Sequence, residues 1–330
     1  MTIMLIVVII VALMFEFING FHDTANVVAT PIATKSLSPY QAIALASLCN
    51  FAGAFLSTNV ASTISEGLVD AHLVSQLVLI TALLSAIGWN LITWRFGIPS
   101  SSSHALIGSL IGAVLAVGSV HDVYFSSIVK KVVLPMVSSP ILAFFLALMI
   151  AVMFARIFHR MHNPRRINRS LREGQVLSCS LLALAHGSND AQKTMSMITL
   201  ALFSYGLVDS AGQIPLWVIV LCATTISLGT LSGGMRIIKT LSSRVAKLGP
   251  MNGVAAEVSS GFLIILASKI GLPVSTTQAA AGSIMGSGYT GKVGINWPIV
   301  RSMATAWIIT LPICGTLSYT MYRLLFAWFQ

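Results

Sequence analysis

Charged residues are scarce in this chain. Asp, Glu, Lys and Arg make up 8% of its 330 residues, whereas hydrophobic residues make up 56%. A soluble domain carries about 25% charged residues, so this composition excludes a soluble fold. Because a spanning helix needs about 20 apolar residues, the chain can supply roughly ten segments at membrane depth. The sequence therefore predicts an all-α polytopic membrane protein.

Acidic residues are rarer than basic ones, nine against nineteen, and the net charge is +10. Much of the excess gathers in 156–173, where six arginines are typical of a cytoplasmic loop, so we expect no nucleic-acid partner. The four cysteines stand singly in apolar runs without metal-ligand spacing. Nucleotide-binding loops and nucleophile–base pairs are also missing, so we expect neither an enzyme nor a cofactor.

Two similar polar phrases interrupt the apolar runs. Asn19–Asn26 reads NGFHDTAN and His186–Lys193 reads HGSNDAQK, so that Asp190 follows Asp23 by 167 positions. An ionised carboxylate at membrane depth costs about 3 kcal/mol or more, and such residues usually mark an ion or substrate path. The repetition predicts two halves built around one site.

A second pair of phrases supports the duplication. Phe96–His104 reads FGIPSSSSH, and Ile270–Gln278 reads IGLPVSTTQ 174 positions later. Two matches at nearly equal offsets indicate an internal repeat. We therefore expect a first repeat over 1–155, a basic linker over 156–173 and a second repeat over 174–330.

All four phrases are expected to break their helices. Backbone at membrane depth must satisfy its hydrogen bonds within a helix unless it lines protein or a water-filled cavity. The breaks should therefore lie together, lining one site. They are expected at 19–23, 97–104, 187–190 and 271–278.

Loop charges predict the orientation of the two halves. The loop at 64–72 holds two acids and no base, whereas its counterpart at 236–249 holds four bases and no acid. Because basic loops stay cytoplasmic, the two halves should have inverted topology. The protein should lie in the cell membrane, that is, the plasma or inner membrane. The linker 156–173 should then be cytoplasmic, and both termini should lie outside.

Hydroxyl side chains precede two of the expected helices and are suited to an anion. Helix N-termini carry free N–H groups and partial positive charge, which favour an oxyanion. The hydroxyls can donate to several oxygens of one tetrahedral anion. They belong to Ser101, Ser102, Ser103, Ser275, Thr276 and Thr277.

Carboxylates and carboxamides of the first pair of phrases suit a hard cation such as Na⁺. They belong to Asp23, Asn26, Asn189 and Asp190, and Na⁺ is expected most directly at Asn26 and Asp190. Glu257, in the apolar run 250–268, is a further candidate for a cation or a proton. Other residues keep two interpretations each: Lys193 is either the partner of Asp190 or an anion ligand, and His104 is either a wall residue or functional.

At these phrases the sequence resembles the inorganic phosphate transporter (PiT) family over nearly its whole length. The matching motifs are GFHDTAN and GSNDAQK, and PSSSSH and PVSTTQ. The resemblance implies phosphate symport with Na⁺ or H⁺, inverted repeats, re-entrant helical hairpins and a homodimer. It also implies that Asp23, Asn26, Asn189 and Asp190 serve the phosphate and cation sites. The serines and threonines above would hold phosphate oxygens at the hairpin tips.

Two residues depart from the family pattern. His22 stands where the motif commonly has asparagine, and Gln278 stands where the second half usually has histidine. Together with His104 and Lys193, they are candidates for proton-linked or gating roles. An imidazole that titrates near pH 6.5 favours proton coupling. GFHDTAN also resembles a bacterial low-affinity subgroup linked to protons and metal phosphates.

We therefore expect a secondary transporter that imports phosphate by alternating access. A sulfate symporter of the same family is the first alternative, but sulfate offers no proton that Asp23 or Asp190 could accept in a hydrogen bond. An anion channel is the second. A channel would favour fixed positive charge at its constriction, and buried carboxylates argue against it.

Overall fold

The computed structural model describes residues 2–159, 163–243, 245–289 and 295–329. Over these ranges the chain is helical, with a single isolated β-bridge between Val69 and Val123. Five of the described helices are long and apolar enough to cross a membrane. A sixth span results if α9 (Leu216–Ser232) and α10 (Met235–Ser243), bent by 71° at their junction, are counted together. The predicted all-α polytopic fold is confirmed.

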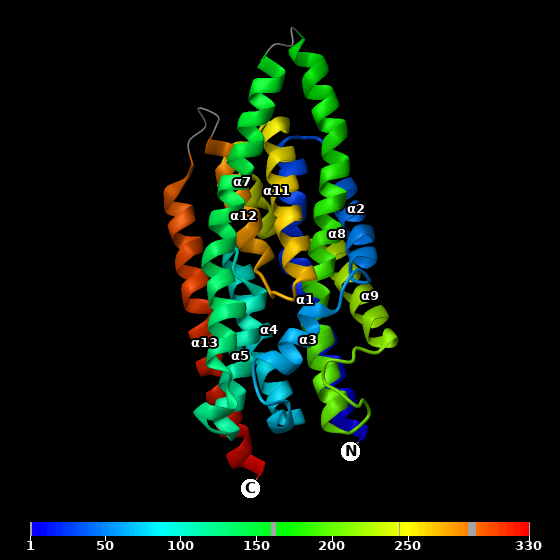
Figure 1. Cartoon of the computed structure of the whole chain (residues 1–330), viewed down its shortest axis with the longest axis vertical. Coiled ribbons are helices and arrows are strands. Elements are labelled where there is room, and N and C mark those ends of the chain that lie inside the picture. Colours follow the sequence, from blue (N-terminus) through cyan, green and yellow to red (C-terminus); the bar gives the residue numbers. More distant parts are fainter. Residues whose placement is uncertain (1, 160–162, 244, 290–294, 330) are drawn as a thin grey trace.

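The first half runs through α1 (Thr2–Ala33), α2 (Pro39–Gly53), α3 (Asn59–Gly67), α4 (Gln76–Phe96), α5 (Ser102–Val117), the short α6 (Phe125–Ile128) and α7 (Leu134–His159). Two single-turn 3₁₀ helices, Ala71–Leu73 and Val120–Asp122, and a π-helical turn, Val129–Val133, complete it. The second half contains α8 (Pro164–Ser204), α9, α10, α11 (Pro250–Lys269), α12 (Thr276–Tyr289) and α13 (Trp297–Phe329). Both termini lie at one end of the molecule, and α7 and α8 project together at the opposite end (Figure 1).

The expected breaks at 19–23 and 187–190 are wrong, because α1 and α8 run without interruption through both phrases. Their glycines permit close helix packing instead. A Cβ on Gly20 would meet the backbone of α9 at Ile226, and one on Gly187 would meet the backbone of α2 at Asn50. The polar side chains of both phrases face neighbouring parts of the protein, so they reach the site without a break in the helical backbone.

Other expected boundaries also shift. Residues 39–67 form two helices, α2 and α3, and the segment expected as a linker at 156–173 is largely helical. Helix α7 continues to His159 and α8 begins at Pro164, where Asn163 caps it through the Arg166 amide. Residues 160–162 of the expected linker lie outside the described residues.

The breaks at 97–104 and 271–278 are confirmed, although each is shorter than expected. Gly97 ends α4 at φ +65°, and Gly271 follows α11 at φ +73°, the left-handed conformation that terminates helices. Two residues later, Pro99 and Pro273 oppose a restart of the same helix. The half-helices α5 and α12 then begin at Ser102 and Thr276, so α4–α5 and α11–α12 form the two predicted hairpins.

Each half-helix packs against the long helix at the end of the other half. Gly108 and Gly112 of α5 lie against the α13 backbone at Leu311 and Gly315. Gly282 and Gly286 of α12 lie in the same way against Pro140 and Phe144 of α7. These contacts fix the depth at which the two half-helices begin.

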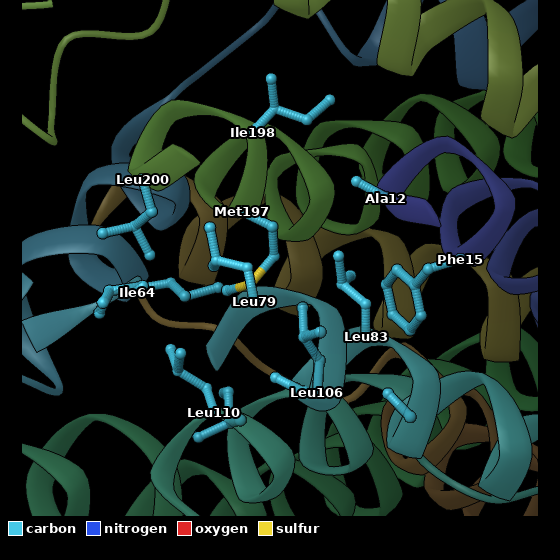
Figure 2. Packing of buried hydrophobic residues seen from close by; sticks show 14 of the residues in the cluster. Ala12, Phe15, Ile64, Leu79, Leu83, Leu106, Leu110, Met197, Ile198 and Leu200 are labelled. Carbon is cyan, nitrogen blue, oxygen red and sulfur yellow. The ribbon is translucent and has the colours of Figure 1, made fainter. Parts of the chain in front are cut away.

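A hydrophobic core supports the site from one side. Figure 2 shows Phe15 of α1, Leu83 of α4 and Leu106 of α5 converging, and Met197 of α8 approaching Leu79. These side chains are fully buried. Because protein interiors are close-packed, the core holds the helices that carry the polar residues in one fixed arrangement.

Candidate functional site

The site lies where the starts of α5 and α12 meet the middle of α1 and α8. The two hairpin tips touch, since the Ser103 hydroxyl donates to the Val274 carbonyl oxygen at 3.1 Å. The polar side chains gathered there are at most 4% exposed. The site is therefore closed to both membrane faces in this structure.

Asp23 joins α1 to both half-helices. Its Oδ2 accepts a hydrogen bond from the Ser102 hydroxyl at 2.6 Å, and its Oδ1 accepts one from Thr277 at 3.4 Å. The Nδ1 atom of His22 lies 2.7 Å from Oδ1. A buried carboxylate needs such partners, because an unpaired one would be strongly disfavoured.

Asp190 occupies the corresponding place on α8. The Lys193 ammonium lies 3.0 Å from its Oδ1 and His186 Nε2 lies 3.3 Å from its Oδ2. The Thr276 hydroxyl donates to Oδ2 at 3.3 Å. Thus Lys193 is an ion-pair partner of Asp190, one of the two interpretations that the sequence left open, and it also donates to Ser102 at 3.1 Å.

Carboxamides complete the cluster. The Asn26 side chain donates to Thr277 at 2.9 Å and to Thr276 at 3.3 Å, which links it to Asp190. Asn189 donates to the Leu272 carbonyl at 3.4 Å. The Oδ1 atoms of Asn26 and Asn189 have no hydrogen-bond partner among the described residues. Buried carbonyl oxygens of this kind are available to a cation or to a hydroxyl donor on a ligand.

Three side chains could hold a cation directly. One ligand atom each from Asp23, His186 and Asp190 lie within 4.8 Å of one another, and all three residues are buried. Carboxylate oxygens suit Na⁺ and Mg²⁺, and imidazole suits transition metals. The helix starts beside them provide N–H groups for an anion, so the cluster can neutralise an oxyanion and a cation together.

Ser101 and Ser275 cap the two half-helices. Ser101 accepts a hydrogen bond from the His104 amide, and Ser275 accepts one from the Gln278 amide, both at 3.3 Å. The ring nitrogens of His104 and the side-chain oxygen of Gln278 have no hydrogen-bond partner in the described part of the chain. The equal geometry indicates that the two hairpin tips are built alike.

Comparison with known proteins identifies the family. Residues 19–318 match the "Phosphate transporter family". The chain belongs to this family. A relative from Mycobacterium bovis, named "Probable low-affinity inorganic phosphate transporter", is 46% identical over 97% of this chain and 77% of its own length. A Bacillus subtilis relative with the same name is 43% identical over 98% and 97% of the two chains.

The fold agrees with a solved structure. The chain superposes on "The sodium-dependent phosphate transporter" with a TM-score of 0.85 and 22% identity, over 99% of this chain and all of that one. At this identity the match shows the fold alone. The family and the fold are those of transporters, which confirms that this family member is not an enzyme.

Glu257 lies outside the cluster around Asp23 and Asp190. Its carboxylate accepts hydrogen bonds from Thr30 at 2.6 Å and Gln175 at 2.8 Å, and a short one from Ser178. These groups join α11 to α1 and α8 along a different part of α8 from Asp190. The cation role expected for Glu257 would therefore require a second site.

Two further residues lie at the site but were not among those predicted for it. His186 contacts Asp190 and also lies 3.1 Å from the Asn50 side chain. Its spacing of four residues from Asp190 on one helix was the available signal. Glu16 is fully buried on α1 and accepts a short hydrogen bond from Thr194, next to Lys193. A carboxylate inside a long apolar run was the signal there.

Proposed function

We propose that this chain is a secondary transporter that carries inorganic phosphate together with a cation by alternating access. One observation carries the proposal: Asp23 and Asp190, 167 positions apart, share a closed cluster with the starts of two half-helices. The half-helix N–H groups and hydroxyls would bind phosphate oxygens. The aspartates would accept the phosphate proton or bind the coupling cation. With phosphate and the cation bound, the charges in the site would neutralise one another. The free-energy cost of passing through a water-free intermediate would then be lower.

The coupling cation is H⁺ or Na⁺, and His22 favours H⁺. His22 lies against Asp23 and also 3.2 Å from the Thr93 hydroxyl, so its protonation would change the charge next to the site. The sodium dependence in the structural relative's name supports Na⁺ as the alternative. Transport of a divalent metal together with phosphate, as a metal phosphate, stays a prediction.

Phosphate is favoured over sulfate by the acceptors in the site. Asp23, Asp190 and the free Oδ1 atoms of Asn26 and Asn189 can accept a hydrogen bond from a P–OH group. Sulfate has no proton to donate at working pH. The names of the curated relatives support the same substrate.

Uptake by proteoliposomes tests this function. Purified protein is reconstituted, and radiolabelled phosphate uptake is measured with an inward H⁺ gradient, an inward Na⁺ gradient or neither. Symport requires that one gradient drive phosphate accumulation above equilibrium. Uptake that ignores both gradients would indicate a channel, and full inhibition by excess sulfate with no preference for phosphate would indicate the sulfate alternative.

We further propose inverted repeats over 1–155 and 174–330 in a homodimer of the plasma or inner membrane, with the 156–173 segment cytoplasmic and the termini outside. The matched hairpin tips and the matched glycine contacts of α5 and α12 support the repeats. Labelling of single cysteines placed at exposed Arg172 and Tyr40 would report the cytoplasmic side. Cross-linking in native membranes would report the dimer.

A further inference from the structure

Part of the cluster around Asp23 and Asp190 is repeated in the two halves. Asp23 accepts a hydrogen bond from Ser102 at the start of α5, and Asp190 accepts one from Thr276 at the start of α12. Ser102 and Thr276 are equivalent by the 174-residue offset of the hairpin phrases, as the two aspartates are by the offset of 167. Each repeat thus contributes one carboxylate and one hydroxyl in the same relation.

A difference in charge between the halves lies three residues after each aspartate. Asn26 in the first repeat and Lys193 in the second are equivalent by the same offset of 167. Each reaches the half-helix start of the other repeat: Asn26 donates to Thr276 and Thr277, and Lys193 donates to Ser102. A neutral carboxamide in one half therefore corresponds to an ammonium in the other.

The Lys193 ammonium lies between oxygen atoms of the kind that bind a cation. It is fully buried and lies 3.0 Å from a carboxylate oxygen of Asp190 and 3.1 Å from the Ser102 hydroxyl oxygen. Carboxylate and hydroxyl oxygens are also the ligands that a hard monovalent cation takes. A buried ammonium is strongly disfavoured without a paired charge, so Lys193 and Asp190 neutralise one another in this closed arrangement.

The other titratable groups facing Lys193 do not remove this pairing. They include Glu16 on α1, His104 on α5, and His186 with Asp190 on α8 itself. Asp23 is connected to Lys193 through Ser102, which donates to one and accepts from the other. Of these groups, Asp190 makes the direct ion pair.

We propose that Lys193 is a fixed counter-cation that replaces one transported cation at Asp190, so that, within the cluster around Asp23 and Asp190, mobile cation is carried at the Asp23–Asn26 half. The inference rests on the proposed cation symport and defines its stoichiometry. A chain with asparagine at position 193 would need one more cation per phosphate to neutralise the same site. Lys193 would thus lower the number of cations carried in each transport cycle by one.

The substitution Lys193→Asn tests this directly, because it installs the first repeat's own residue. Equilibrium phosphate accumulation is measured in proteoliposomes against a graded gradient of the cation that drives the wild type. Each coupled cation multiplies accumulation about tenfold per tenfold gradient. Lys193→Asn should therefore raise accumulation by one further factor of about ten, whereas Lys193→Arg, which keeps the charge, should match the wild type.

An equilibrium binding measurement tests the proposal even for a variant that binds phosphate but does not transport it. Phosphate binding to purified protein is followed by calorimetry at several pH values and Na⁺ concentrations, and the slopes give the cations taken up per phosphate. Lys193→Asn should take up one more than the wild type. If the ion pair is purely structural, Lys193→Asn should lower thermal stability and leave the cation count per phosphate unchanged in both the accumulation and the calorimetry measurements. That result would overturn the proposal. The proposal would also be overturned if Lys193→Asn no longer folded or bound phosphate while Lys193→Arg took up an additional cation.

The reciprocal variant separates this inference from the proposed function. Asn26→Lys should place a second fixed cation in the site and make phosphate binding independent of the coupling cation. If the wild type neither binds nor carries phosphate, the proposed function fails. If the wild type is a cation symporter and neither variant changes the cation count, the function stands and the role of Lys193 is refuted.

Discussion

The Ser102 hydroxyl donates a hydrogen bond to Asp23 at 2.6 Å, although 79 residues separate them. This bond ties the start of half-helix α5 to the middle of the continuous helix α1. Thr276 makes the equivalent bond from α12 to Asp190 on α8. Any ligand that binds between the hairpin tips must share or displace these hydrogen bonds, so binding there is coupled to the relative position of hairpins and long helices.

We expect Asp23→Asn and Asp190→Asn each to reduce phosphate uptake to background while the protein is still expressed. Each substitution removes a buried charge that takes part in charge-assisted hydrogen bonds worth about 1.5–3 kcal/mol, or about tenfold or more in binding. Uptake in proteoliposomes measures the effect. Asp209→Asn, the same change at an exposed loop residue, is the matched control. Normal uptake by either site variant would refute the assignment of the cluster.

Ser102→Ala should raise the phosphate concentration needed for half-maximal uptake by about tenfold. The hydroxyl both donates to Asp23 and accepts from Lys193, and its loss leaves buried charged groups short of a partner, at a cost of about 1–3 kcal/mol. Initial uptake rates over a phosphate series report the change. Ser126→Ala, on the exposed side of the short helix α6, should be neutral. Equal curves for Ser102→Ala and wild type would exclude a role in substrate binding.

Glu257→Gln should abolish the stimulation of uptake by the coupling-cation gradient if this carboxylate takes up the cation. The substitution keeps the size of the side chain but removes the negative charge that Thr30, Gln175 and Ser178 surround. Uptake with and without the gradient is compared in the same vesicle preparation. Glu173→Gln, exposed on α8 beside Arg169, should retain full stimulation because exposed ion pairs contribute little. Retained stimulation in Glu257→Gln would make its hydrogen bonds purely structural.

Gly112→Ala and Gly286→Ala should both destabilise the protein. An added Cβ would overlap the Gly315 carbonyl in one case and the Phe144 carbonyl in the other, and overpacking costs about 1–3 kcal/mol. Thermal unfolding in detergent is the measurement. Gly174→Ala on α8 is the control, since nothing lies within 4 Å of its added Cβ and alanine favours a helix by about 0.5–1 kcal/mol. Similar unfolding temperatures for Gly112→Ala and Gly174→Ala would contradict the packing contact.

The hairpins were predictable because their signals are local. Gly97 and Pro99, with Gly271 and Pro273, stop a helix through backbone conformation and a missing donor, whatever surrounds them. The polar phrases around Asp23 and Asp190 were correctly predicted to lie together, but their helix breaks were not correct. Asn19, Gly20 and Gly187 give the same local signal whether a helix opens or another helix packs closely against it, and only the neighbouring backbones of α9 and α2 distinguish these outcomes.

The sequence by itself determined a helical membrane protein with duplicated polar phrases, because hydropathy and backbone chemistry act over short stretches of chain. The tertiary structure decided which polar groups pair: Lys193 with Asp190 and Ser102, Glu257 with Thr30, and His186 with Asn50. Pairing depends on the depth and rotation of packed helices, set by close glycine contacts between segments far apart in the chain. No local pattern contains that information, since it arises only when the helices pack.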